Sequence, residues 1–196
     1  LKKAYKEQLD KVKDASAKAA GARLGQHAAL LLLEARAQDR LERIDAATHE
    51  PAPGKFVIPP ESKMRAGVTM ARMKPFGIAS LASFDPGPPP APDSQVALDN
   101  AREIRSAGAR DSTSRTADQT AAALFWNSDP ISNEFVKLIR TTLEARKLGL
   151  LDTARLLALD HMSGFDASVA EIAFKEKYGH WRPETAIAGP HAHASV

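Results

Sequence analysis

The chain has 196 residues, of which 43% are hydrophobic and 26% are charged, so it is long enough to bury a core and has the composition of a globular domain. Its formal net charge is only +3 and 6% of its residues are aromatic, which together argue against a dedicated nucleic-acid-binding protein. It contains no cysteine, which excludes disulfides, thiolate zinc sites and a thiol nucleophile, and its longest apolar run, residues 28–33, is too short to span a bilayer.

The first 49 residues are predicted to form N-terminal helices. Residues 1–14 are rich in lysine and have weak helical periodicity, whereas residues 16–47 consist mainly of strong helix formers. One apolar stripe at helical spacing runs through the second stretch: Leu24, His27, Ala28, Leu31, Leu32 and Ala35. The pattern therefore predicts a long helix that ends near Ala47.

Two features of this helix concern its neighbours. Gly21 and Gly25 lie four residues apart, which favours the close approach of another helix and leaves open a homo-oligomer formed through the N-terminal helices. His27 lies on the apolar stripe, where a histidine is more often a satisfied core or interface residue than a ligand. We therefore expect His27 to have a structural role.

Residues 50–93 are dominated by proline, with ten of the thirteen prolines of the chain. This density excludes a continuous helix. The same stretch carries many apolar side chains whose exposure to water would be unfavourable: Phe56, Val57, Ile58, Met64, Met70, Met73, Phe76, Ile78, Leu81 and Phe84. We therefore expect an ordered, extended segment that crosses a helical body, with residues 88–90 in polyproline geometry.

Helical signals return in residues 94–196, the predicted helical core. Asp93-Ser94 is expected to cap a helix over residues 95–106, a second helix covers residues 116–126, and Ser128-Asp129-Pro130 begins a third that Gly149 ends. Asp152 is expected to cap the last and longest helix, whose buried stripe would be Ala154, Leu157, His161, Phe165, Val169 and Ile172. The prediction is an all-α fold in a single domain over residues 1–196, because no long alternating run indicates a strand.

A basic pair marks the end of the last helix. Lys175 and Arg182 lie seven residues apart, Gly179 between them favours a helix stop, and Pro183 biases Arg182 toward an extended conformation. An ammonium group and a planar guanidinium are the donors that a tetrahedral oxyanion requires. The alternative from the residues alone is that both cations only complement the helix dipole. Asp160 and Asp166 are either tuning groups for such a site or surface and capping carboxylates.

The segment Lys175-x6-Arg182-Pro183-x-Thr185-Ala186-Ile187 resembles the first signature motif of the vanadium-dependent haloperoxidases. These enzymes share a helical bundle and an oxyanion site with the type 2 phosphatidic acid phosphatases and the bacterial acid phosphatases. Weaker similarity to this family covers most of the chain, from the residues 21–39 to the proline-rich crossing and residues 114–126. The resemblance therefore implies a helical bundle of the haloperoxidase and acid phosphatase type.

The second motif of the family is Pro-Ser-Gly-His, and residues 190–193 match it at the first and last positions. By resemblance, His193 and Lys175 are the catalytic residues, and Lys175, Arg182, His191 and Ala192 bind vanadate or phosphate. His191 and Ala192 replace the usual serine and glycine. Only six residues separate Pro183 from Pro190, which indicates either a shortened loop or residues missing from this stretch. The third motif, which holds the vanadium-ligating histidine, is absent, so we expect a chain that is incomplete at its C-terminus and ligates no metal directly.

The resemblance implies oxidation of halide by hydrogen peroxide at a protein-bound vanadate. The alternative is a soluble acid phosphatase that hydrolyses phosphate esters with the same residues, and the third hypothesis is a non-catalytic helical fragment or interaction module. The expected cofactor is vanadate, or phosphate in a phosphatase. The resemblance also favours a secreted or periplasmic protein, whose signal peptide would have been removed.

Overall fold

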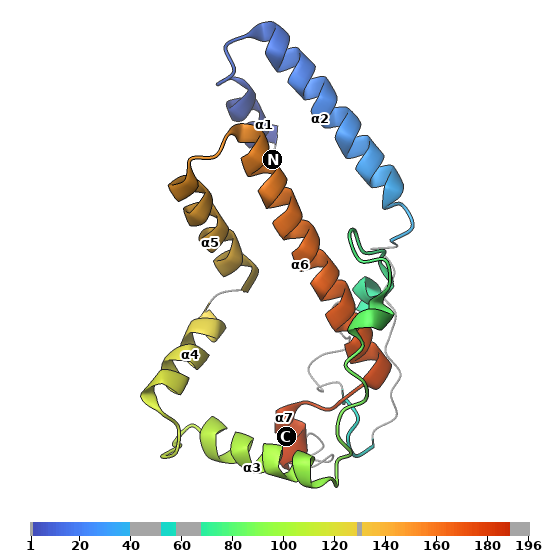
Figure 1. Ribbon diagram of the computed structural model, residues 1–196, viewed down its shortest axis with the longest axis vertical. Coiled ribbons are helices and arrows are strands. Elements are labelled where there is room, and N and C mark those ends of the chain that lie inside the picture. Colours follow the sequence, from blue (N-terminus) through green and yellow to red (C-terminus); the bar gives the residue numbers. More distant parts are fainter. Residues whose placement is uncertain (1, 40–51, 58–67, 129–130, 189–196) are drawn as a thin grey trace. The chain divides into compact units, whose positions relative to one another are not determined.

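The computed structural model describes residues 2–39, 52–57, 68–128 and 131–188 (Figure 1). In these ranges the chain forms helices and no strand, and its single backbone bridge joins Lys55 to His180. The elements in chain order are α1 (Lys2–Leu9), α2 (Ala15–Ala35), η1 (Val68–Arg72), η2 (Leu81–Phe84), α3 (Gln95–Gly108), α4 (Ala117–Ser128), α5 (Ile131–Arg146), α6 (Leu150–Tyr178) and α7 (Pro183–Ala188). The all-α prediction is therefore confirmed for the described ranges.

The chain divides into two compact units, residues 1–43 and residues 44–196. The single domain predicted over residues 1–196 stays a prediction. None of the described helices combines the length and apolar character that a membrane crossing would require.

In the first unit, α1 is followed by a short turn and α2 begins after Asp14, whose carboxylate accepts a hydrogen bond from the Ala17 amide at 2.9 Å. The helix ends at Ala35, because Arg36 leaves helical geometry with φ −104° and ψ 5°. The prediction of a helix that continues to Ala47 is therefore wrong at residues 36–39, and residues 40–47 lie outside the described ranges.

The apolar stripe of α2 is exposed: Leu24, Leu31 and Leu32 have 71%, 53% and 50% of their surface in contact with solvent. His27 is also exposed, so it is not a core histidine of the described chain, and its role as an interface histidine stays a prediction. Apart from the adjacent residues and the nearby backbone of α2 itself, no heavy atom of the described chain lies within 4 Å of the position that a Cβ would occupy at Gly21 or Gly25. The homo-oligomer through these helices stays a prediction.

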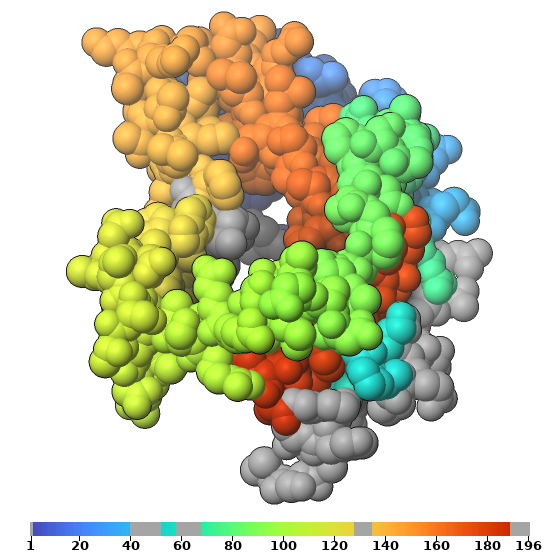
Figure 2. All heavy atoms as spheres, turned by 60° about the horizontal axis from the view of Figure 1, so that its bottom comes forward, coloured from blue at the N-terminus to red at the C-terminus, as the bar shows by residue number. Residues whose placement is uncertain are grey.

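In the second unit, the proline-rich segment is ordered in its described part and packs on α6 through η1 (Figure 1). The space-filling view also places the green residues around η2 against the orange and red surface of α6 (Figure 2). The segment is not extended throughout, because residues 68–72 and 81–84 form 3-10 helices. Such short turns suit a stretch in which frequent prolines prevent a longer helix.

The best-buried apolar residues of this unit come from η1, the residue after it, α5 and α6. Val169 of α6 is completely buried, and Val68, Met73 and Leu143 are 6–8% exposed. The expectation that the apolar side chains of the proline-rich segment avoid water is wrong at Phe76 and Phe84, which are 39% and 59% exposed. Ile58 and Met64 lie outside the described ranges. The Phe76 ring instead meets Phe165 of α6 edge-on, with the ring centres 5.3 Å apart.

A buried carboxylate fastens the proline-rich segment to α6. Asp166, 4% exposed, accepts hydrogen bonds from the backbone amides of Phe76 at 2.6 Å, Gly77 at 2.7 Å and Ile78 at 3.2 Å. Residues 76–78 lie in no helix or strand, so their amides have no partner in a regular element, and the buried carboxylate supplies the acceptor. Asp166 is therefore a structural residue of the interior, and the prediction that it is a surface carboxylate is wrong.

The helix boundaries of the core region follow local signals in part. Ser94 caps α3 as expected, with its hydroxyl accepting a hydrogen bond from the Ala97 amide at 3.3 Å. The expected stop of α5 at Gly149 is wrong: the helix ends at Arg146, because Lys147 adopts the left-handed conformation with φ 51°. Gly149 instead precedes α6, and Asp152 lies in its first turn rather than at its cap.

The buried stripe of α6 is correct in its C-terminal half only. Val169 is buried as expected, whereas Leu157, Phe165 and Ile172 are only half-buried. Ala154 and His161 are exposed, and the His161 ring lies 2.9 Å from the Leu157 carbonyl oxygen of its own helix. Burial therefore concentrates where the proline-rich segment lies on α6.

Two arginines hold the ends of shorter helices in the second unit. The guanidinium of Arg115 donates to the carbonyls of Ala107 and Ala109 at 2.8 and 3.0 Å, so it satisfies acceptors at the C-terminus of α3. Arg105 of α3 donates to the Ile187 carbonyl of α7 at 3.1 Å, and α3 and α7 are in contact. Both arginines place a cation at a helix C-terminus, where the dipole is negative.

Replacing Asp166 with alanine should lower the free energy of unfolding by about 2–4 kcal/mol, because three backbone donors lose a charged acceptor. Urea unfolding followed by circular dichroism measures this loss. Asp160→Asn on the same helix is the matched control and should change stability by less than about 1 kcal/mol. Equal stability of D166A and the native chain would contradict the structural role.

Replacing Lys147 with glycine should raise the free energy of unfolding by about 0.5–1 kcal/mol, because glycine adopts φ 51° without the steric cost that a side chain meets there. Lys147→Ala keeps the Cβ and should bring no such gain. Thermal unfolding of the two variants compares them directly, and a glycine variant no more stable than the alanine variant would show that the left-handed residue is not strained.

Candidate oxyanion site at the end of α6

The end of α6 is built around Gly179, which takes the left-handed conformation with φ 53° and donates its amide to the Lys175 carbonyl at 2.9 Å. Four residues later α7 begins at Pro183, whose ring suits a first helical turn, and the Arg182 carbonyl accepts the Ala186 amide at 3.0 Å. The expected helix stop between Lys175 and Arg182 is confirmed.

The two cations of the predicted site lie on either side of this turn along the chain. The Lys175 side chain is 59% exposed and its ammonium forms an ion pair with the carboxylate of Glu171, one turn earlier on α6. The Arg182 side chain is exposed, and its guanidinium forms no hydrogen bond or ion pair with the described part of the chain. Arg182 is thus accessible to an anion, whereas Lys175 is shared with a carboxylate.

The remaining predicted site residues, His191, Ala192 and His193, lie outside the described residues. The structure therefore places two of the five residues, Lys175 and Arg182, and the arrangement of the complete set stays a prediction. Within the described ranges, no group of three histidine, aspartate or glutamate side chains is arranged to hold a metal ion.

A backbone clamp from the proline-rich segment holds the turn at Gly179. The Phe56 amide donates to the Gly179 carbonyl at 2.7 Å, and the Trp181 amide donates to the Gly54 carbonyl at 3.1 Å. These two bonds flank the bridge between Lys55 and His180. In the space-filling view the cyan residues 52–57 lie beside the red C-terminal part of the chain (Figure 2).

Gly54 fits this clamp tightly. It has φ 80°, and a Cβ at this position would lie 2.5 Å from Cγ of Pro92, so a larger residue would be strained and would collide with the proline ring. The clamp was not predicted, because its partners are more than 120 residues apart and backbone pairing leaves no side-chain pattern in the sequence. The one local signal was the Pro51-x-Pro53-Gly54 turn composition.

The clamp also sets the environment of His180. Partial burial lowers the pKa of this imidazole, and the nearby Lys55 ammonium lowers it further, while a hydrogen bond to the Gly54 backbone acts in the opposite direction. Neutral imidazole is therefore favoured near neutral pH, and the positive charge at this end of α6 comes from lysine and arginine.

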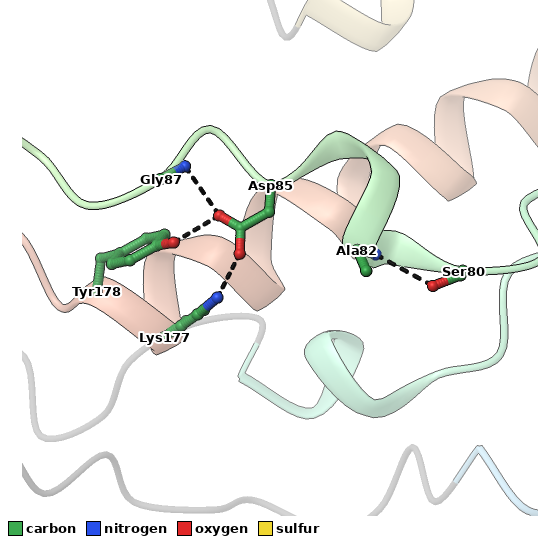
Figure 3. A network of polar contacts seen from close by, with 6 residues as sticks. All are labelled: Ser80, Ala82, Asp85, Gly87, Lys177 and Tyr178. Atoms are coloured by element: carbon green, nitrogen blue, oxygen red, sulfur yellow. Dashed lines mark hydrogen bonds and ion pairs between the residues drawn. The ribbon is translucent and has the colours of Figure 1, made fainter.

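A second tie joins the proline-rich segment to the last turn of α6 (Figure 3). The Asp85 carboxylate accepts from the Gly87 amide at 2.9 Å, and it also contacts the Tyr178 hydroxyl at 2.5 Å and pairs with the Lys177 ammonium. Mainly because of the Lys177 bond, the pKa of Asp85 falls from its ordinary value of 3.8 to about 2. The same carboxylate raises the pKa of Lys177 and of Tyr178.

The chain was compared with protein families, curated proteins and solved structures. No protein-family model, no curated protein and no solved structure matches the chain.

The Asp85 tie should stabilise the fold above pH 3.8 and lose its effect as the pH falls toward 2, because the folded state holds the carboxylate ionised more strongly than the unfolded state does. Asp85→Asn should therefore lower the urea midpoint at pH 5 but not at pH 2. Measuring the midpoint of both proteins at pH 5, 3 and 2 tests this. A difference between them that persists unchanged at pH 2 would contradict the assignment.

Proposed function

We propose that the turn between α6 and α7 binds a tetrahedral oxyanion, and that the protein is of the vanadium-dependent haloperoxidase type. The observation that carries the proposal is the helix stop at Gly179, which puts Lys175 in the last turn of α6 and Arg182 immediately before α7, both with exposed charged groups. Two cations of different geometry near one rigid turn suit an anion with several oxygens.

The donor set fits such an anion chemically. Arg182 offers a planar fork that binds two oxygens at once, and Lys175 offers a compact charge for a third. Glu171 pairs with Lys175 in the structure, and an exposed pair of this kind is weak, at about 0.3–0.5 kcal/mol. A doubly charged anion that also contacts Arg182 would therefore displace the Glu171 carboxylate at small cost.

In the proposed site, Lys175 and Arg182 would neutralise the oxygens of the bound anion, and His191 and Ala192 would contact it from the Pro190 segment. His193 would hold or release a proton beside the anion, because an imidazole titrates near neutral pH. Bound vanadate would supply the Lewis acidity that lets hydrogen peroxide oxidise a halide. The chain's own part is to bind, orient and neutralise the anion.

The clamp at Gly179 supports this role by fixing the turn. The pairs Phe56–Gly179 and Trp181–Gly54 hold the backbone on both sides of His180, so the chain between Lys175 and Arg182 has little freedom. Donors that are positioned before binding lose less conformational entropy when the anion arrives. The proposal therefore uses the proline-rich segment as the scaffold of the site.

Two assays separate the functions that share these residues. A haloperoxidase brominates a phenol dye only when vanadate and hydrogen peroxide are both present, whereas an acid phosphatase releases phosphate from an aryl phosphate and is inhibited by vanadate. We expect vanadate-dependent bromination. If neither activity appears and vanadate does not raise the melting temperature, the chain is a non-catalytic helical protein and the proposal is wrong.

Lys175→Ala and Arg182→Ala should each weaken vanadate binding by about 1 kcal/mol, or about fivefold, because both groups are exposed and water screens their charge. Isothermal titration with vanadate measures the change. Arg155→Ala, an exposed cation nearer the start of α6, is the matched control and should bind like the native chain. If all three variants bind equally, the anion is held elsewhere.

A further inference from the structure

The clamp at Gly179 brings a third basic side chain to the end of α6. The two bonds of the clamp belong to the residues on either side of Lys55 and His180, so these two residues form the non-hydrogen-bonded pair of an antiparallel bridge. In such a pair the Cα atoms are about 4.5 Å apart, and both side chains project from the same face. Lys55 and His180 therefore lie side by side, although they are far apart in the sequence.

Arg182 continues the same face. Residues 181 and 182 lie between the bridge and α7 and belong to no helix, and Pro183 favours an extended conformation at Arg182. Successive side chains of an extended chain point to opposite faces, so the side chain of Arg182 shares the face of His180, two residues earlier. Diagonal neighbours across such a pair are about 7–8 Å apart, which places Lys55 and Arg182 within reach of one small anion.

Lys55 carries a charge that no described carboxylate neutralises. Its side chain is exposed, and its ammonium donates to the carbonyl of Tyr178, the last residue of α6, at 3.5 Å. Lys55 forms no ion pair within the described ranges. An ammonium has three donor hydrogens, so the bond to Tyr178 leaves two for a ligand. The charge also reaches the bridge partner: burial is the main cause of the lowered pKa of His180, and Lys55 lowers this pKa further.

We propose that Lys55 is a binding residue for the oxyanion and that, together with Arg182, it makes the site selective for a doubly charged tetrahedral anion. The assignment rests on the proposed function, which puts the anion at Arg182. A tetrahedral oxyanion has four oxygens: the Arg182 fork takes two and Lys175 a third, so Lys55 binds the fourth. Coulomb attraction is proportional to the charge of the anion, so each cation contributes twice as much to the binding of a dianion as to that of a monoanion.

The experiment follows the His180 ring of the full chain by nuclear magnetic resonance, and His180→Gln identifies its signals among those of the six histidines. Sulfate and perchlorate are the probes, because both are tetrahedral, carry two and one negative charges, and take up no proton near neutral pH. Each anion is titrated at constant ionic strength. We expect the His180 signals to shift saturably with sulfate, and perchlorate to bind more weakly.

Substitutions at Lys55 test the charge. Lys55→Met should weaken sulfate binding by about fivefold and perchlorate binding by about twofold, because the lost attraction is half as large for the monoanion. Lys55→Arg retains the charge and should keep sulfate binding within about twofold of the native chain. Arg155→Met removes an exposed cation nearer the start of α6 and should change neither anion. Lys55 is exposed and joins the bridge through its backbone, so both variants should keep the native helix content, which circular dichroism checks.

A purely structural role of Lys55 gives a different result. If Lys55 acted only through its bond to the Tyr178 carbonyl, its loss would weaken both anions by the same factor. Equal weakening therefore overturns the assignment. The same conclusion follows if Lys55→Met binds sulfate like the native chain, or if the His180 ring of the native chain does not respond to sulfate.

These outcomes are separate from a failure of the proposed function. Vanadate-dependent bromination by a chain whose Lys55→Met variant binds sulfate normally would keep the haloperoxidase type and remove Lys55 from the site. A charge-dependent loss of binding in Lys55→Met without any bromination would keep Lys55 at an anion site, in a protein that is not a haloperoxidase.

Discussion

The carboxylate of Asp166 is the interaction on which the second unit depends. It lies in the interior of the fold and receives three consecutive backbone amides, from Phe76, Gly77 and Ile78, that no helix or strand could satisfy. Through it, a segment too rich in proline to form a regular element gains a fixed position on the longest helix of the described chain. The best-buried side chain, Val169, lies one turn further along α6, so polar satisfaction and apolar burial occur together at this point.

Two other ties act toward the end of the same helix. The Asp85 carboxylate joins Lys177 and Tyr178, and the backbone of residues 54–56 pairs with the backbone around His180. Each tie is modest, because surface ion pairs and exposed backbone bonds contribute little individually. Together they order the chain on both sides of Gly179. This order matters for the proposed oxyanion site, because its two cations are exposed. A backbone that is already fixed loses less conformational entropy when an anion binds, which favours binding.

The sequence predicts what is decided within a few residues and misses what is decided by distant partners. The stop at Gly179 and the cap at Ser94 followed from residue type, because a left-handed residue and an N-cap each act on the adjacent turn. The role of Asp166 could not be predicted from residue type. An aspartate on a helix gives the same sequence pattern whether it is exposed to water or accepts hydrogen bonds from the amides of a segment about 90 residues away. The end of α5 at Lys147 was missed because a lysine in the left-handed region has no local signal. The turn between Lys175 and Arg182 was predicted from the sequence, whereas the clamp that holds this turn was not.

The most direct test of the central claim is native-state hydrogen exchange at the amides of Phe76, Gly77 and Ile78, resolved by nuclear magnetic resonance. If Asp166 holds these amides, they should be protected well beyond their unfolded-chain exchange rates in the native protein. In D166A this protection should be lost, while the amides inside α3 keep theirs. Amides 76–78 that exchange in the native protein as fast as an unstructured peptide would contradict the account.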